Sequence, residues 1–267
     1  MKKNSTFVAI VIVLSIIVGF LLWSMVLGAP SNFTDAAKEH PVKDNILALM
    51  YKGGFLVGVL LSLSLMVVTF VIERLLALSK AKGKKDLDTF LHSAEKHLND
   101  GNLDAVIDLC NQQKGSVANI LRAGVDRFKA IQNNSSLTPE MKIEEVKKTL
   151  EEVTMLETPL MEQNLVVLST IASISTMVGL LGTVLGMIRS FRALGESGGG
   201  AAASQLSTGI SEALWNTALG IGGAIIAIVF YNFFTNKVDK FTYLIDEASL
   251  NLQETLKTRF LGKGQHA

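Results

Sequence analysis

The chain has 267 residues, 49% of them hydrophobic and 18% charged, with a net charge of +1 and a mean hydropathy of +0.37. Soluble globular domains usually carry about 25% charged residues, so this apolar excess, gathered in a few long blocks, indicates a membrane protein with several spans. The near-zero net charge gives no overall field that would attract nucleic acid. A single cysteine, Cys110, excludes an internal disulfide and is expected to remain a reduced thiol.

Four blocks are long and apolar enough to cross a bilayer, which takes about 20 residues. They are residues 7–27, 55–78, 165–188 and 210–234. The first block follows two lysines, as a signal peptide would, but its apolar run is longer than the usual stretch of about 7–15 residues. We therefore expect residues 1–29 to form a retained N-terminal transmembrane anchor. A cleaved signal peptide is the alternative, although Pro30 would then adjoin a cut after Ala29.

Lysines and arginines set the expected orientation. Residues 80–164 contain twelve of them, residues 28–53 three and residues 189–208 two. Because positively charged loops stay in the cytoplasm, we expect both termini to lie there. The predicted order is an outward loop at 30–53, a transmembrane helix at 54–78, a cytoplasmic helical domain at 79–164, a transmembrane helix at 165–191, an outward hairpin loop at 192–208, a transmembrane helix at 209–235, and a cytoplasmic C-terminal helix and tail at 236–267.

The predicted cytoplasmic domain is helical in pattern. Apolar residues recur every three or four positions between Leu87 and Leu98. A break at residues 100–102 separates this helix from two further amphipathic helices, at 103–109 and 117–131. We find no β pattern and no internal repeat, so the sequence predicts an all-α protein.

A longer helix is predicted to start at Thr138, as N-cap, and Pro139, as the first helical residue. The pattern stays helical from Pro139 to Phe191, which is about 80 Å at 1.5 Å per residue. We expect one helix that projects into the cytoplasm and is kinked at Pro159. The fourth block likewise runs on past Asn236 into an amphipathic tail.

Residues 192–208 contain the run Gly-Gly-Gly-Ala-Ala-Ala at 198–203 and are expected to form a flexible hairpin between the last two spans. A glycine-rich loop also suggests a phosphate cradle. No strand pattern precedes this one and no lysine follows its glycines, so we set that interpretation aside.

Hydroxyl side chains form a line along the third block. Those that fall within about 80° of one another on a helix are Ser169, Ser173, Thr176 and Thr183. Beside them run glycines at the three-and-four spacing that lets helices approach closely in lipid, namely Gly179, Gly182 and Gly186. Ser169 and Ser173 are expected to bond back to their own helix, with a place in a functional hydroxyl line as the alternative, whereas Thr183 is expected to line a lumen.

The fourth block has a matching face of small and polar residues. Its members are Gly209, Glu212, Ala213, Asn216, Thr217, Gly220, Gly223, Ala224 and Ala227. Glu212 and Thr217 are about 140° apart around a helix, so they mark the two borders of this face. Glu212 is the only ionisable residue well inside either of the last two spans. A charge at membrane depth costs at least about 2.5 kcal/mol, which makes Glu212 a functional candidate; the alternative is an interfacial residue that reaches lipid headgroups.

A lone carboxylate between two lines of hydroxyls suits proton movement, because hydroxyls both donate and accept hydrogen bonds. A metal ion would require several carboxylates or carbonyls, so we expect no metal and no cofactor. A complete relay also needs a titratable group deep in the bilayer, which we infer a partner subunit supplies. No paired carboxylates or nucleophile–base pair indicate an enzyme, and the histidines are scattered.

Two runs in these spans resemble a known family. Residues 178–191, VGLLGTVLGMIRSF, resemble the G-L-x-G-T-V-x-G-x-x-x-x-F pattern of the MotA/TolQ/ExbB proton-channel family. Residues 209–220, GISEALWNTALG, with Tyr231 and Asn232 resemble its G-I-x-E-A-L-x-x-T-A-x-G…Y-N pattern. Two such motifs, in order on adjacent membrane helices, are a specific signal, and a weaker resemblance extends over residues 47–256.

The chain departs from the family pattern in two places. The proline that usually precedes the first motif is absent, because Ser-Thr-Met stands at residues 175–177. The first apolar block, residues 7–27, is extra relative to the common three-span plan and is expected to pack outside the pentamer or to contact another component.

The resemblance implies an all-helical homopentamer around a central pore in a bacterial inner membrane, closest to ExbB or TolQ. It implies a single-pass ExbD- or TolR-like partner with an aspartate in the lumen, and proton flow that drives a TonB- or TolA-like protein. The residues expected to line the proton pathway are Thr183, Thr217, Glu212, Thr176 and Asn216. Those expected to pack the helices are Gly179, Gly182, Gly186 and Gly220. An ExbB-like role in TonB-dependent transport is favoured over a TolQ-like role in the Tol-Pal envelope system; a non-conducting scaffold is the third possibility.

Overall fold

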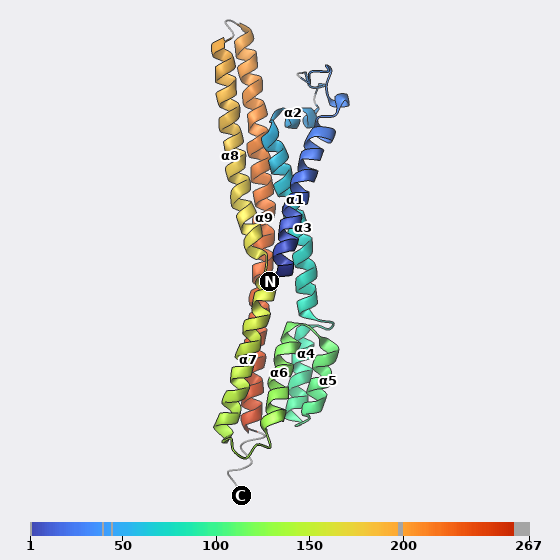
Figure 1. The fold of residues 1–267 in the computed structure, drawn as a ribbon, viewed down its shortest axis with the longest axis vertical. Helices are drawn as coiled ribbons and strands as arrows, with labels where there is room; N and C mark the ends of the chain where they lie inside the picture. Colours follow the sequence, from blue (N-terminus) through green and yellow to red (C-terminus); the bar gives the residue numbers. More distant parts are fainter. Residues whose placement is uncertain (1, 39, 44, 197–199, 259–267) are drawn as a thin grey trace. The chain divides into compact units, whose positions relative to one another are not determined.

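The computed structural model describes residues 2–38, 40–43, 45–196 and 200–258, and within them it contains helices and one isolated antiparallel bridge, between Phe33 and Pro41 (Figure 1). The α-helices are α1 (Lys2–Leu21), α2 (Ile46–Lys52), α3 (Phe55–Lys82), α4 (Leu87–Asn99), α5 (Leu103–Gln113), α6 (Ser116–Ile131), α7 (Pro139–Glu162), α8 (Leu165–Glu196) and α9 (Gly200–Leu256). A π-helix, η1 (Leu22–Leu27), continues α1, and a 3-10 turn, η2 (Pro30–Asn32), follows it. The all-α prediction is confirmed for these residues.

Four stretches of the described chain are long and apolar enough to cross a membrane. They are Thr6–Leu27, Phe55–Asn99, Pro139–Gly195 and Leu206–Leu256. Each contains one of the four blocks predicted from the sequence. The chain is therefore a multi-pass membrane protein by the length and composition of its helices.

The chain divides into two compact units. The first comprises Met1–Ile72 and Asn164–Asn232, and the second comprises Glu73–Gln163 and Phe233–Ala267. In the first unit α8 lies beside α9, and α1 lies beside α3 (Figure 1). Gly19 and Gly58 allow the second contact, since a Cβ on Gly58 would lie 3.1 Å from the Phe20 ring.

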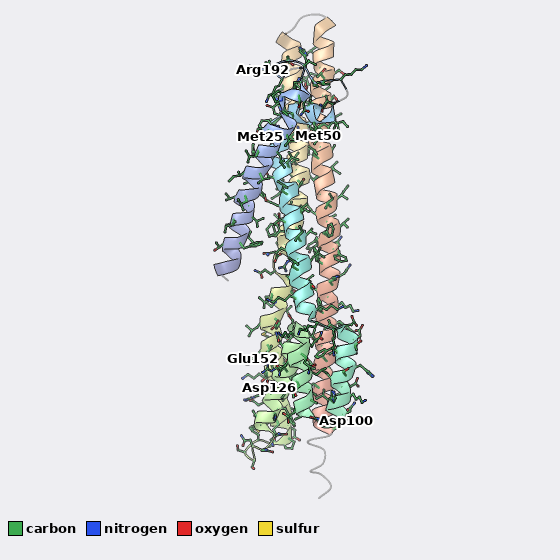
Figure 2. All side chains as sticks on the ribbon, turned by 90° about the vertical axis from the view of Figure 1, so that its right-hand side faces the viewer. Met25, Met50, Asp100, Asp126, Glu152 and Arg192 are labelled. Carbon is green, nitrogen blue, oxygen red and sulfur yellow. The ribbon has the colours of Figure 1, made fainter. Side chains whose placement is uncertain are left out.

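The second unit packs α4 to α7 around the C-terminal part of α9. Its core side chains at most 1% exposed include Phe90, Val106, Val125, Phe128, Val146, Ile245 and Leu252. Charged residues such as Asp100, Asp126 and Glu152 lie on its outside (Figure 2). The apolar positions predicted at three-and-four spacing in α4 are the ones that face this core, as the amphipathic pattern requires.

Thr138 caps α7 as predicted, because its hydroxyl accepts a hydrogen bond from the Met141 amide at 3.3 Å and Pro139 is the first helical residue. The prediction of one continuous helix from Pro139 to Phe191 is wrong. Helix α7 ends at Glu162 and α8 begins at Leu165. Asn164 adopts φ +61° at this break, a left-handed conformation that asparagine tolerates better than most residues.

The stretch 192–208, predicted as a loop, is largely helical. Helix α8 continues to Glu196 and α9 starts at Gly200, while residues 197–199 of the glycine run lie outside the described residues. The alanines at 201–203 are the strongest helix formers, and they outweigh the glycine that precedes them.

Candidate functional site

The hydroxyls of Thr183 on α8 and Thr217 on α9 hydrogen-bond to each other. The Gly179 carbonyl oxygen lies 3.2 Å from Thr217 Oγ1 and 3.3 Å from Thr183 Oγ1, so the hydroxyl that accepts within the pair can donate to it. The Ala213 carbonyl oxygen is 3.5 Å from Thr183 Oγ1. Either hydroxyl can act as donor in the pair, so the direction of its hydrogen bonds can reverse, which a proton-conducting chain requires.

Glycines bring α8 and α9 close enough for these hydroxyls to meet. A Cβ on Gly220 would lie 2.8 Å from the Gly179 Cα, and a Cβ on Gly179 would lie 2.9 Å from the Asn216 carbonyl oxygen. A Cβ on Gly182 would lie 2.5 Å from the Asn216 Cβ, and one on Gly186 would overlap the Ala213 Cβ. All four glycines therefore sit at the α8–α9 contact, where small residues permit close approach.

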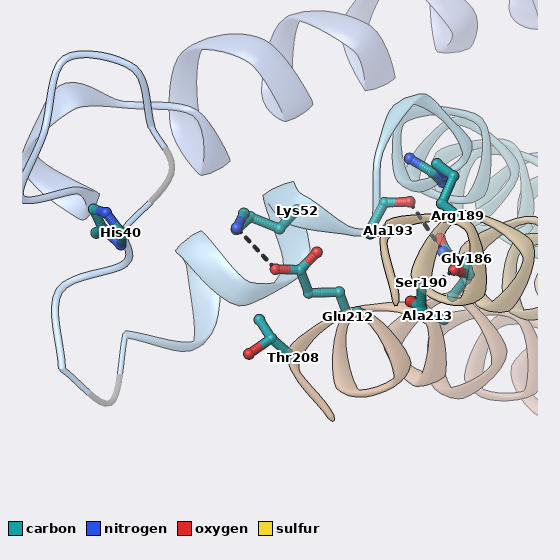
Figure 3. Close-up of a pocket in the computed structure, with 12 residues that line it drawn as sticks. His40, Lys52, Gly186, Arg189, Ser190, Ala193, Thr208, Glu212 and Ala213 are labelled. Atoms are coloured by element: carbon teal, nitrogen blue, oxygen red, sulfur yellow. Dashed lines mark hydrogen bonds and ion pairs between the residues drawn. The ribbon is translucent and has the colours of Figure 1, made fainter. Parts of the chain in front are cut away.

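Glu212 and Asn216 face a different neighbour. Glu212 Oε1 forms an ion pair with Lys52 Nζ of α2 at 2.9 Å (Figure 3). One turn further along α9, Asn216 Nδ2 donates to the Gly53 carbonyl oxygen at 3.0 Å. Asn216 is 1% exposed, and its buried Oδ1 has no hydrogen-bond partner among the described residues. Thus Glu212 and Asn216 turn towards α2, whereas Thr217 turns towards α8, in keeping with the angle predicted from their spacing.

A cavity of about 660 Å³ lies between α2, α8 and α9, and Glu212 and Asn216 line it (Figure 3). We call it the Glu212 pocket. Its other lining residues are His40, Lys52, Gly53, Gly186, Arg189, Ser190, Ala193, Thr208, Gly209 and Ala213. Polar side chains form part of its lining, and within it Lys52 pairs with the Glu212 carboxylate.

The remaining predicted hydroxyls lie elsewhere, in a groove of about 500 Å³ between α8 and α9 that also includes Tyr231 and Asn232. Each donates to its own helix: Ser169 to the Val166 carbonyl at 3.0 Å, Ser173 to the Ser169 carbonyl at 3.2 Å, and Thr176 to the Ala172 carbonyl at 3.2 Å. The back-bonding expected for Ser169 and Ser173 is confirmed. Thr176 is therefore not part of the Thr183–Thr217 cluster.

No group of three or more His, Cys, Asp or Glu side chains that could hold a metal ion occurs among residues 2–38, 40–43, 45–196 and 200–258. The Thr183–Thr217 pair supplies hydroxyls. The Glu212 pocket supplies an amide, an ion-paired carboxylate and the basic side chains of His40, Lys52 and Arg189.

Sequence reasoning missed Lys52. The residue was counted only as a loop charge, because nothing local predicts that α2 folds back against α9. A lysine directly before an apolar span, in a chain with one carboxylate in its last two spans, was the available signal.

The family model of the MotA/TolQ/ExbB proton channel family matches residues 112–247, just over half of the chain. The chain is 30% identical over 196 residues to the Tol-Pal system protein TolQ of Haemophilus influenzae, a match that covers 70% of this chain and 83% of that protein. It is 35% identical over 119 residues to the Tol-Pal system protein TolQ of Pseudomonas aeruginosa, covering 45% and 51%.

The biopolymer transport protein ExbB of Aquifex aeolicus is 35% identical to the chain over 118 residues, which is 44% of this chain and 71% of that protein. The match to the Pseudomonas protein spans only about half of that protein's length. The matched family region contains α8, with Thr183, and the part of α9 that carries Glu212 and Thr217. The chain therefore belongs to the MotA/TolQ/ExbB proton channel family.

Proposed function

We propose that the chain is the channel-forming subunit of a motor driven by the proton-motive force in a bacterial inner membrane. In this proposal it acts like ExbB, as a homopentamer around a central pore, and together with a single-pass ExbD-like partner it energises TonB-dependent transport across the outer membrane. The observation that carries the proposal is the reversible Thr183–Thr217 hydroxyl pair at the glycine contact of α8 and α9.

The chemistry favours protons over metal ions as the conducted species. Threonine hydroxyls and an amide can support a chain of water molecules, whereas a metal ion would need several oxygen ligands of higher charge. Glu212 is the one acid that the described part of α8 and α9 contributes near this pair. The aspartate of an ExbD- or TolR-like partner would supply the titratable group deeper in the bilayer.

The same proposal fixes the topology. Both termini and residues 79–164 are cytoplasmic, and the segments 30–53 and 192–208 face the periplasm, because twelve lysines and arginines lie in residues 80–164. Helix α9 has 57 residues, more than twice the length of about 20 that a bilayer requires. Its remainder, with α7, would extend into the cytoplasm.

Two other functions are consistent with the same helices. A TolQ-like subunit, working with a TolR-like partner and a TolA-like protein, would use the same proton chemistry, and two of the relatives carry that name. A non-conducting scaffold would use the glycine contact only for packing. It predicts that Thr183→Val and Glu212→Ala leave energised transport intact.

The test is co-purification of the full chain with an ExbD- or TolR-like protein of the same organism, followed by reconstitution into vesicles. A pH-sensitive dye would report proton uptake driven by a potassium-diffusion potential. We expect a stable complex and proton uptake that requires both proteins. Complementation of host strains that lack ExbB or TolQ separates the two systems. A complex with no uptake above protein-free vesicles would contradict the proposal.

A further inference from the structure

We infer that Lys52 is a positioning residue for Glu212, and that the N-terminal helix holds Lys52 in place through Tyr51. The inference rests on the proposed proton-channel function and assigns a role to the segment that the family pattern lacks. It starts from the Lys52–Glu212 ion pair at 2.9 Å, whose two side chains are 23% and 17% exposed.

Glu212 needs a partner to fix its direction. A glutamate side chain has three rotatable bonds, and the pocket around this one is large enough, at about 660 Å³, to let the carboxylate swing. The other strong cation in the pocket, Arg189, is engaged elsewhere. Its Nε donates to the Leu185 carbonyl at 3.3 Å, and its guanidinium lies over Gly54, 3.6 Å from where a Cβ would stand. His40 lines the pocket from the loop before α2. Lys52 is therefore the group that sets where the carboxylate points, and it does so by charge attraction, since Glu212 Oε1 has no hydrogen-bond partner among the described residues.

The direction matters because Glu212 lies one turn before Asn216, whose buried Oδ1 lacks a hydrogen-bond partner among the described residues. A buried acceptor without a partner, in a residue that lines the Glu212 pocket, can accept a hydrogen bond from a water molecule. A water at that position would link the carboxylate to Asn216, which packs against Gly182, the residue before Thr183. With Glu212 so held, protons would enter through the Glu212 pocket inside each protomer and pass from there to the threonine pair.

Helix α2 has only seven residues, too few to be stable alone in water, so its position depends on what surrounds it. Tyr51, next to Lys52, stacks on Trp23 with ring centroids 5.0 Å apart and meets the edge of Phe33 at 5.5 Å. Trp23 Nε1 donates to the Tyr51 carbonyl at 3.3 Å.

A second chain of contacts joins the same elements through two asparagines. Asn45 caps α2 by accepting from the Leu47 amide at 3.0 Å, and its Nδ2 donates to Asn32 Oδ1 at 3.1 Å. Asn32 Nδ2 in turn donates to the Leu27 carbonyl of η1 at 2.9 Å. The residues that follow the extra helix α1 thus hold α2 in place through these contacts, and α2 carries Lys52.

The test uses the full chain with its co-purified partner in vesicles and compares proton uptake in single and double variants. Glu212→Gln and Lys52→Met should both lower uptake, the second by between about 10-fold and 100-fold, as misplacement of a reacting group does. Lys52→Arg should retain at least half of the uptake. Lys43→Met, at an exposed lysine of the same segment, should match wild type. In the double variant, Lys52→Met should cause no further loss of proton uptake beyond that of Glu212→Gln alone. Tyr51→Ala should lower proton uptake as Lys52→Met does, whereas Tyr51→Phe should not.

A structural role is separated by exchanging the charges, as Lys52→Glu with Glu212→Lys. Lys52→Met should lower the melting temperature of the protein. The charge exchange should restore the melting temperature but should not restore proton uptake. Recovery of uptake in the exchange variant, wild-type uptake in Lys52→Met, or equal losses in Lys52→Met and Lys52→Arg would each overturn the inference while leaving the channel function in place. Loss of the channel function itself would show as absent uptake in the wild-type complex.

Discussion

Replacing Gly220 by alanine should separate α8 from α9 and break the hydrogen bond from Thr217 to the Gly179 carbonyl. A Cβ at position 220 would lie 2.5 Å from the Ser175 carbonyl oxygen and 2.8 Å from the Gly179 Cα, both backbone atoms that cannot rotate away. The helices would have to move apart by about 0.6–0.9 Å to reach the ordinary contact distance of 3.4 Å. The 3.2 Å bond from Thr217 to the Gly179 carbonyl would then lengthen to about 4 Å, beyond hydrogen-bonding range.

Overpacking of this kind destabilises a folded protein by about 1–3 kcal/mol. Gly222→Ala is the matched control, because a Cβ there meets nothing within 4 Å and alanine favours a helix by up to about 1 kcal/mol over glycine. Denaturant unfolding in detergent, followed by circular dichroism, gives the stability, and vesicle assays give proton uptake. Equal stability and equal uptake in the two alanine variants would refute the reasoning that close backbone contact assembles the site.

Two further predictions concern the second unit. Arg74 is 1% exposed, forms an ion pair with Glu73 and donates to the Met161 carbonyl at 3.2 Å, so Arg74→Met should lower the free energy of unfolding by about 3–5 kcal/mol. The control Arg122→Met removes an exposed i,i+4 pair with Asp126 and should lower the free energy of unfolding by about 0.3–0.5 kcal/mol. Similar losses for the two variants in a denaturant titration would contradict this expectation. Burial raises the pKa of Cys110 to about 12. At pH 8 the thiol of the folded protein should therefore react with iodoacetamide about 10³-fold more slowly than a free thiol, and its reaction should become faster only as the pH approaches 12. Rapid labelling of the folded protein at pH 8, measured by mass spectrometry, would contradict this prediction, because it would show that the thiol is accessible and ionised.

Sequence periodicity predicted the four spans and the short helices around Leu87, Val106 and Val125, because each helix buries one face and exposes the other. The N-cap at Thr138 was predictable for a local reason, since its partner Met141 is three residues away. The end of α7 was not. It depends on a left-handed residue at Asn164 and on Arg74, which donates to a carbonyl 87 residues further along the chain.

The candidate site divides in the same way. The spacing of Glu212 and Thr217 predicted two different directions, and the glycines predicted a close contact. Neither pattern predicts which residues the threonines and Glu212 contact. Pairing of Thr183 with Thr217 depends on the register of two helices, and pairing of Glu212 with Lys52 depends on how a seven-residue helix is held by residues of η1 and the loop after it.

The Thr183–Thr217 pair is proposed to conduct protons. The most direct test of this proposal is potential-driven proton uptake by vesicles that contain the co-purified complex with Thr183→Val, compared with Thr170→Val. Thr170 is an exposed residue of α8 whose hydroxyl donates to its own helix, at the Val166 carbonyl, so the control removes the same atom from the same helix. We predict a loss of about 10²-fold or more for Thr183→Val and wild-type uptake for Thr170→Val. Equal uptake by both variants, in complexes of equal stability, would contradict the claim.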